Sequence, residues 1–123
     1  DVALLLISHE LRQVLALCNR IAVMQAGQLR EVASAERLIR SPSNPYTATL
    51  LESVFALPRR STDTIVAPKD EPRKMNSRES GQSGCTFRPR CPRASRLCET
   101  SIPKLQKVSS DHLVACHFPI EPG

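Results

Sequence analysis

Four cysteines in the last forty residues are the clearest set of side chains with ligand chemistry. Cys85, Cys91, Cys98 and Cys116 follow one another with five, six and seventeen residues between them. Four thiolates satisfy one metal centre, either a four-iron, four-sulfur cluster or a structural zinc ion. Two disulfides, with three possible pairings, or free thiols would use the same residues. The spacing alone leaves these alternatives open.

Four arginines lie among these cysteines, and positive charge of this kind would offset an anionic metal centre. They are Arg88, Arg90, Arg93 and Arg96. Pro92 directly after Cys91 matches the Cys-Pro of bacterial ferredoxins. The same arginines are compatible with nucleic-acid binding, but only Phe87 is near enough to stack on a base, so we expect no nucleic-acid partner.

Two histidines and the fifth cysteine are weaker ligand candidates. His112 and His117 are reserve ligands for the cysteine centre. Cys18 falls on the apolar face of a predicted helix, where a cysteine behaves as a small buried hydrophobe. We therefore leave Cys18 out of the metal site.

His9 is a candidate phosphate contact. It follows an unbroken apolar run over residues 2–7, which is typical of a strand buried on both faces of a parallel sheet. A helix is expected directly afterwards, with Ser8 as its cap and an apolar face at Leu11, Val14, Leu15 and Cys18. An imidazole at the carboxyl edge of such a sheet, where a helix begins, can bind a terminal phosphate.

Further elements are expected between these two groups. Residues 21–24 and 29–32 predict a hairpin, with Gly27 at a positive φ in the turn. Helices are expected from Ser34 to Arg40 and over residues 45–55, the second with Asn44 as cap and Pro45 at its first position. We thus divide the chain into an α/β part at 1–57, a linker at 58–83 and a cysteine module at 84–123.

Length, charge and composition set the outer limits. The 123 residues carry a formal net charge of +5 and only four aromatic side chains, so aliphatic residues must build the core. No apolar run approaches the ~20 residues that span a bilayer, so we expect no transmembrane helix.

Three stretches together resemble one protein family. Residues 5–11 (LLISHEL) and 18–27 (CNRIAVMQAG) resemble the histidine-switch region of ABC transporter ATPases. Residues 42–47 (PSNPYT) with Leu50-Leu51 resemble a stretch found in oligopeptide and dipeptide importer ATPases, and the cysteine segment resembles the carboxy-terminal extension of that subfamily. Ser8, Glu10 and Asn44 depart from its usual Thr, Asp and His.

The resemblance implies the carboxy-terminal part of a P-loop ABC ATPase domain, with His9 contacting the γ-phosphate of ATP bound with Mg²⁺. It also implies a 4Fe-4S cluster on the four cysteines in some members, with zinc as the alternative. The expected partners are a second ATP-binding subunit, transmembrane permease subunits and an extracytoplasmic peptide-binding protein. The expected location is the cytoplasmic face of the inner membrane.

Several parts of such an ATPase are not in this sequence. It contains no G-x-x-x-x-G-K-[ST] loop, so we expect this chain alone to be inactive. The transported substrate, whether dipeptide, oligopeptide or nickel, is left open. The competing interpretation is a free-standing metal-stabilised binding module without ATPase activity.

Overall fold

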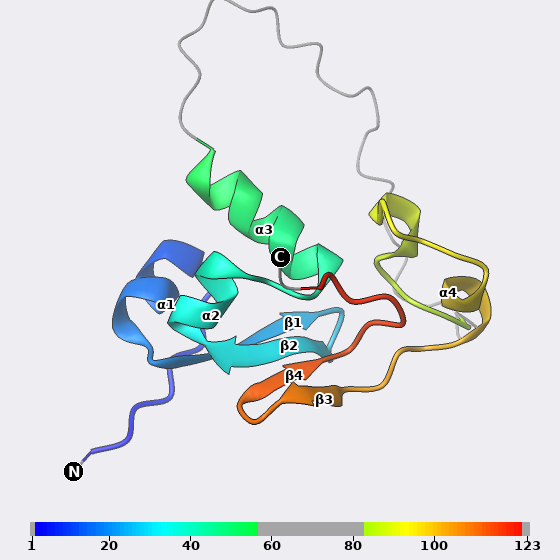
Figure 1. Ribbon diagram of the computed structural model, residues 1–123. Coiled ribbons are helices and arrows are strands. Elements are labelled where there is room, and N and C mark those ends of the chain that lie inside the picture. The colour runs from blue at the N-terminus through cyan, green and yellow to red at the C-terminus, as the bar shows by residue number, and fades with distance from the viewer. Residues whose placement is uncertain (1, 57–82, 122–123) are drawn as a thin grey trace, which may run out of the picture.

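The computed structural model describes residues 2–56 and 83–121, and their centre is one antiparallel four-stranded sheet. The strands are β1 (Arg20–Gln25), β2 (Gln28–Ser34), β3 (Gln106–Ser109) and β4 (His112–Val114), in the spatial order β1-β2-β4-β3. The helices are α1 (Leu11–Leu17), α2 (Ala35–Arg40), α3 (Pro45–Phe55) and α4 (Leu97–Thr100), with a 3-10 turn, η1, at Arg88–Arg90. Figure 1 shows α1, α2 and α3 on one side of the sheet and α4 in a separate lobe.

The predicted hairpin is confirmed as β1 and β2, each longer than expected. Ala26 and Gly27 form its two-residue turn with φ of 49° and 75°, a conformation that suits a tight hairpin. Ile21 and Val23 alternate with exposed neighbours along β1, as a half-buried strand requires.

Both helices that follow the hairpin are confirmed, α3 with its predicted cap Asn44 and α2 with Ser34 as its cap instead of its first residue. Ser34 accepts a hydrogen bond from the Arg37 amide at the start of α2, and Asn44 accepts one from the Tyr46 amide at the start of α3. These caps satisfy amides that have no partner within the helix.

The core lies between the hairpin and the first helices. Ile21, Val23, Ala33 and Leu38 form its buried cluster. Cys18 is half-buried against this cluster, as the sequence predicts, together with Val14 and Leu15 of α1.

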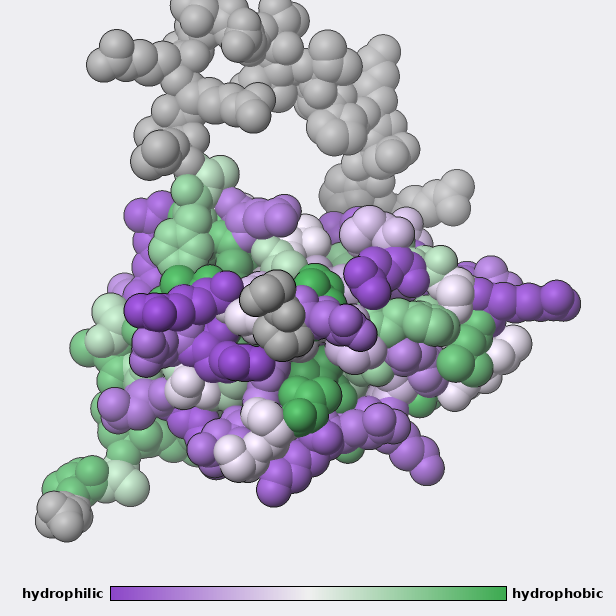
Figure 2. Space-filling view, in the orientation of Figure 1, coloured by the Kyte–Doolittle hydropathy of each residue, from purple (hydrophilic) through white to green (hydrophobic). Residues whose placement is uncertain are grey.

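The strand predicted at residues 2–7 is wrong. The segment has no regular structure, and its apolar side chains are largely exposed, with Val2 at 98 % and Ile7 at 89 %. A strand needs backbone partners, and in the described part of the chain the sheet strands pair only with one another, all of them antiparallel. Figures 1 and 2 show this apolar segment leading away from the body of the molecule at the amino terminus.

The predicted start of the first helix is also wrong. Helix α1 begins at Leu11 with Glu10 in the cap position, and Ser8 Oγ accepts a hydrogen bond from the Glu10 amide at 3.0 Å. Ser8 therefore shapes the turn before the helix instead of capping it.

The cysteine segment adds strands to the hairpin sheet. Glu31 of β2 pairs with Val114 of β4, and Val32 pairs with Leu113. The Ile120 amide also donates to the Ser43 carbonyl at 2.7 Å. The described residues on the two sides of the predicted linker are thus joined by one sheet, while almost all of the linker, 58–83, lies outside the described residues. The boundaries 1–57, 58–83 and 84–123 stay a prediction.

None of the helices in the described part of the chain has the length and apolar character needed to cross a membrane.

Candidate functional site

The structure brings Cys85, Cys91, Cys98 and Cys116 to one cavity. They come from four separate places: the loop after residue 83, the end of η1, helix α4 and the residue pair after β4. The cavity has a volume of about 20 Å³, more than the ~10–15 Å³ that one water-sized particle occupies. The four cysteines, although separated by five, six and seventeen residues in the sequence, therefore meet at one place in the fold.

Gly84 fixes the position of Cys85 against α4. Its φ is +112°, and a Cβ at this position would lie 2.4 Å from the carbonyl oxygens of Cys98 and Glu99. The Cys85 amide donates to the Cys98 carbonyl at 2.8 Å. Only glycine allows this close approach, which holds two of the four cysteines together.

The cysteine thiols influence one another electrostatically. Burial raises the pKa of the Cys116 thiol above its ordinary value, a hydrogen bond with the Phe118 backbone lowers it, and the charges of Cys91, Cys85 and Cys98 raise it further. Burial likewise raises the pKa of Cys91, with Cys85 and Cys98 adding to the effect. Cys91 and Cys116 therefore favour their protonated form without a metal, and metal binding to these two thiols would release protons.

The thiols are not arranged as a finished metal site. All five cysteines of the chain carry free thiols. Among residues 2–56 and 83–121, no three His, Cys, Asp or Glu side chains are grouped so that they could hold a metal ion. Metal binding at the cavity thus requires the cysteine side chains to come closer together.

Arg30 of β2 reaches the same cavity, although it is not among the predicted site residues. Its Nη1 donates to Cys85 Sγ at 3.9 Å and its Nη2 donates to Thr86 Oγ1. Between the pairs Val23–Glu31 and Met24–Leu29, Arg30 is the extra residue of a β-bulge. A bulge interrupts the alternation of a strand and re-aims a side chain, so Arg30 and Glu31 are both buried.

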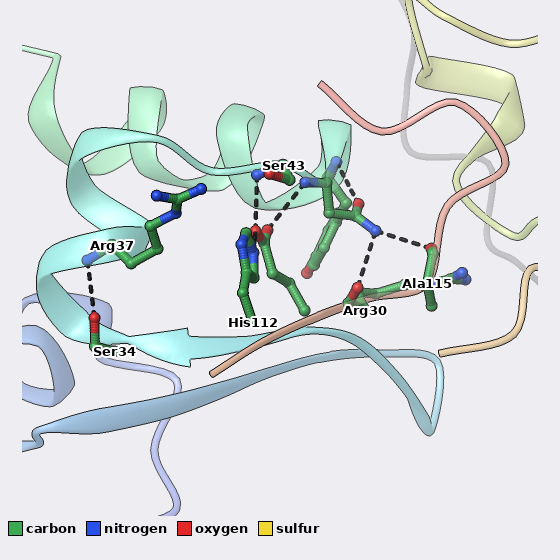
Figure 3. Close-up of polar contacts among 9 residues, drawn as sticks. Arg30, Ser34, Arg37, Ser43, His112 and Ala115 are labelled. Atoms are coloured by element: carbon green, nitrogen blue, oxygen red, sulfur yellow. Dashed lines mark hydrogen bonds and ion pairs between the residues drawn. The ribbon is translucent and has the colours of Figure 1, made fainter. Parts of the chain in front are cut away.

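A buried polar network lies beside the cavity (Figure 3). Glu31 accepts hydrogen bonds from the amides of Ser43 and Asn44 at 2.7 and 3.0 Å, and its Oε1 lies 2.6 Å from His112 Nε2. The Asn44 side chain donates to the carbonyls of Arg30 and Ala115 at 3.1 and 2.9 Å. This network ties β2, the start of α3 and the end of β4 together.

The reserve ligands and the four arginines divide into two groups. His117, Arg88 and Arg93 line the cavity, whereas Arg90 and Arg96 do not, and all four arginines are exposed to solvent. Arg93 Nε donates to the Phe118 carbonyl at 3.1 Å, and His117 Nε2 lies 2.9 Å from the Ser101 carbonyl. His112 is bound to Glu31 instead.

Among the described residues, His9 makes no hydrogen bond to this network. Its side chain is 96 % exposed, and its Nε2 lies 3.7 Å from Glu10 Oε1. It precedes α1 in a turn rather than standing in the first turn of the helix, where the sequence analysis placed it. The contact of His9 with a γ-phosphate stays a prediction.

The fold and the cavity define a small mixed helix–sheet domain with a four-cysteine pocket where a hairpin meets a cysteine-rich tail. Residues 30–98 match the family model of the oligopeptide/dipeptide transporter, C-terminal region. This match covers more than half of the chain, which belongs to that family.

Related proteins agree with the family match. Over 116 residues the chain is 37 % identical to a Brucella ovis protein whose name describes a peptide import ATP-binding protein, covering 94 % of this chain and 35 % of that protein. It is 31 % identical to the oligopeptide transport ATP-binding protein OppD of Salmonella typhimurium, over 98 % of this chain and 35 % of OppD. It is 33 % identical to AppF of Bacillus subtilis, an oligopeptide transport ATP-binding protein, over 96 % of this chain and 36 % of AppF. The chain spans about a third of the length of these relatives.

Proposed function

We propose that this chain is the carboxy-terminal part of an ATP-binding subunit that couples ATP hydrolysis to peptide uptake. The observation that carries the proposal is the similarity to peptide-import ATP-binding proteins over 94 % or more of the chain, together with the family match at residues 30–98. Dipeptides or oligopeptides are the proposed cargo, with nickel as a further candidate.

The complete subunit would work with a second ATP-binding subunit, transmembrane permeases and an extracytoplasmic peptide-binding protein. It would lie peripherally at the cytoplasmic face of the membrane. ATP binding would close the two ATP-binding subunits on each other, and hydrolysis would reopen them. The phosphate-binding loop is absent from this sequence, so these steps belong to the complete subunit.

His9 is the proposed residue that positions the γ-phosphate of Mg-ATP in that subunit. The His9 side chain is 96 % exposed to solvent in the described part of the chain. Its imidazole is therefore accessible to a nucleotide held by other parts of the complete subunit. The test is the ATPase rate of the complete subunit with its permeases. We expect His9→Ala to lower this rate by at least about tenfold, which is 1.4 kcal/mol in the barrier.

The matched control for His9 is Arg12→Ala, which alters an exposed side chain three residues away. We expect Arg12→Ala to leave the ATPase rate within about twofold of the unchanged protein. An unchanged rate in His9→Ala would contradict the proposed role of His9.

The four-cysteine cavity is the proposed metal centre, with a 4Fe-4S cluster first and zinc second. The donor set fits, because four thiols line one cavity and cationic Arg30, Arg88 and Arg93 line it too. A cluster held there would supply structural cross-linking and one-electron redox chemistry. Cys85, Cys91, Cys98 and Cys116 would hold it.

An anaerobic absorption spectrum of the full chain, with iron, acid-labile sulfide and zinc measured on the same sample, tests the centre. Broad absorption near ~400 nm with about four irons and four sulfides per chain supports the cluster, and about one zinc per chain supports the alternative. Cys98→Ser should lose the metal, whereas the control Cys18→Ser should keep it. Folded protein that takes up neither metal would overturn the metal centre and favour thiols or disulfides.

A further inference from the structure

Arg30 is a buried cation that no carboxylate neutralises within the described part of the chain. The residue is 1 % exposed. Its guanidinium donates hydrogen bonds to Cys85 Sγ and Thr86 Oγ1, which are both uncharged partners when Cys85 is a thiol. Its Nε has no hydrogen-bond partner. The adjacent buried carboxylate, Glu31, is already bound to His112 and to two backbone amides.

A buried charge is unfavourable unless an opposite charge or several hydrogen bonds compensate it. The possible states of the four cysteines differ in what they offer Arg30. Protonated thiols and disulfides are neutral and leave the guanidinium uncompensated. Four thiolates on one Zn²⁺, or on an oxidised 4Fe-4S cluster, carry a net charge of about −2.

The backbone of Arg30 is tied to the opposite end of the ligand set. Its carbonyl accepts the Ala115 amide at 2.8 Å, and Ala115 directly precedes Cys116. Its side chain meanwhile reaches Cys85 Sγ. The bulge in β2 thus holds both the first and the last of the four cysteines in the sequence, as residues outside the ligand set commonly do in metal sites.

We propose that Arg30 is the counter-charge and positioning residue of an anionic thiolate–metal centre, to which it donates a hydrogen bond at Cys85 Sγ. This inference rests on the metal centre proposed above and not on the ATPase role. It assigns the hairpin, and not only the cysteine tail, a part in holding the metal.

The test compares the full chain with its Arg30→Met and Arg30→Lys variants after anaerobic loading with iron and sulfide or with zinc. The main readout is the rate at which a chelator removes the metal. Arg30→Met should lose metal about 10- to 100-fold faster than the unchanged chain, as expected for a residue supporting metal ligands. Arg30→Lys keeps the charge and should recover part of this loss. The control is Arg90→Met, an exposed arginine one residue before Cys91, which should match the unchanged chain.

Two further measurements separate this role from simple packing. In the metal-free state, Arg30→Met should unfold at the same or a higher temperature than the unchanged chain, because it removes an uncompensated buried charge. If the centre is a cluster, the variant's reduction potential should be more negative, and a tenfold shift of the one-electron equilibrium corresponds to 59 mV. A packing role alone predicts lower metal-free stability.

The possible outcomes distinguish this inference from the metal centre itself. If the unchanged chain binds metal and Arg30→Met retains it equally well, the role of Arg30 is overturned while the metal centre stands. If Arg30→Met destabilises the metal-free chain as much as the loaded chain, the counter-charge argument is also overturned. If the unchanged chain binds no metal, both proposals fail.

Discussion

The arm at residues 2–9 exposes apolar side chains, whereas the junction between β2, the start of α3 and β4 buries polar side chains. In the arm, Val2 and Ile7 are 98 % and 89 % exposed. In the junction, Arg30, Glu31 and His112 are 1 %, 0 % and 2 % exposed. Partners explain the difference. The junction supplies hydrogen-bond partners for its polar groups from three elements, whereas the arm has no neighbouring strand among the described residues.

Removing the carboxylate of the junction should have the largest effect on stability. Glu31→Ala leaves two buried amides and His112 without their partner, so we expect the free energy of unfolding to fall by about 3–5 kcal/mol. Urea unfolding followed by circular dichroism measures this loss.

Glu36→Ala is the matched control for Glu31→Ala, because Glu36 pairs with Arg40 on the exposed face of α2 at 3.3 Å. We expect that variant to lose no more than about 0.5 kcal/mol. Equal losses for the two variants would show that the junction contributes no more than a surface ion pair.

Adding a Cβ at Gly84 should have the next largest effect. Gly84→Ala places a methyl group 2.4 Å from two backbone carbonyl oxygens at a φ of +112°, so we expect a loss of about 3 kcal/mol. Thermal unfolding of the full chain measures it.

Gly27→Ala separates backbone strain from crowding. Gly27 has a φ of +75°, but a Cβ there would have no neighbour within 4 Å. Backbone strain alone should therefore cost about 1 kcal/mol. A Gly84→Ala loss as small as this would mean that α4 moves away easily from Gly84.

Truncating Asn44 should lower the stability of the chain by less than the Gly84 substitution does. Asn44→Ala removes the cap of α3 and two hydrogen bonds from the side chain to buried carbonyls, so we expect a loss of about 2 kcal/mol. Denaturant unfolding checks it, with Ser34→Ala as a comparison that removes only a cap, worth about 1 kcal/mol. If Asn44→Ala loses no more than Ser34→Ala, the two cross-element hydrogen bonds contribute nothing.

Changing the arm should have the smallest effect. Leu5 is 85 % exposed, so we expect Leu5→Ser to change the stability of this chain by less than about 0.5 kcal/mol. Leu38→Ala in the core should lose about 2–5 kcal/mol in the same assay, since Leu38 is 1 % exposed. A loss in Leu5→Ser comparable to that in Leu38→Ala would show that the arm packs against the domain.

Local sequence signals predicted the local elements well. The hairpin, α2 and α3 followed from Gly27, Ser34, Asn44 and Pro45, because turns and caps depend on residues close in sequence. The strand at 2–7 failed because an apolar run indicates burial only where a partner strand is available.

The four cysteines of the candidate site were predictable from the sequence, but their surroundings were not. Cysteine spacing identified four side chains that do share a cavity. Arg30 was not predicted because its position depends on a β-bulge and on the pairing of β2 with β4, in which Val32 and Leu113 are 81 positions apart in the sequence. Two consecutive charged residues inside a predicted strand, Arg30-Glu31, were the only local sign that the alternation is broken there.

The central claim is that the hairpin and the cysteine tail form one cooperative unit, and amide hydrogen exchange measured by NMR tests it most directly. The informative amides are those of Asn44, which donates to Glu31, and Ala115, which donates to Arg30, compared with the core amide of Ile21. We predict that all three open with the same free energy, within about 0.5 kcal/mol, and that Glu31→Ala lowers them together. If Ala115 exchanges orders of magnitude faster than Ile21 and is unaffected by Glu31→Ala, the tail folds independently and the claim is contradicted.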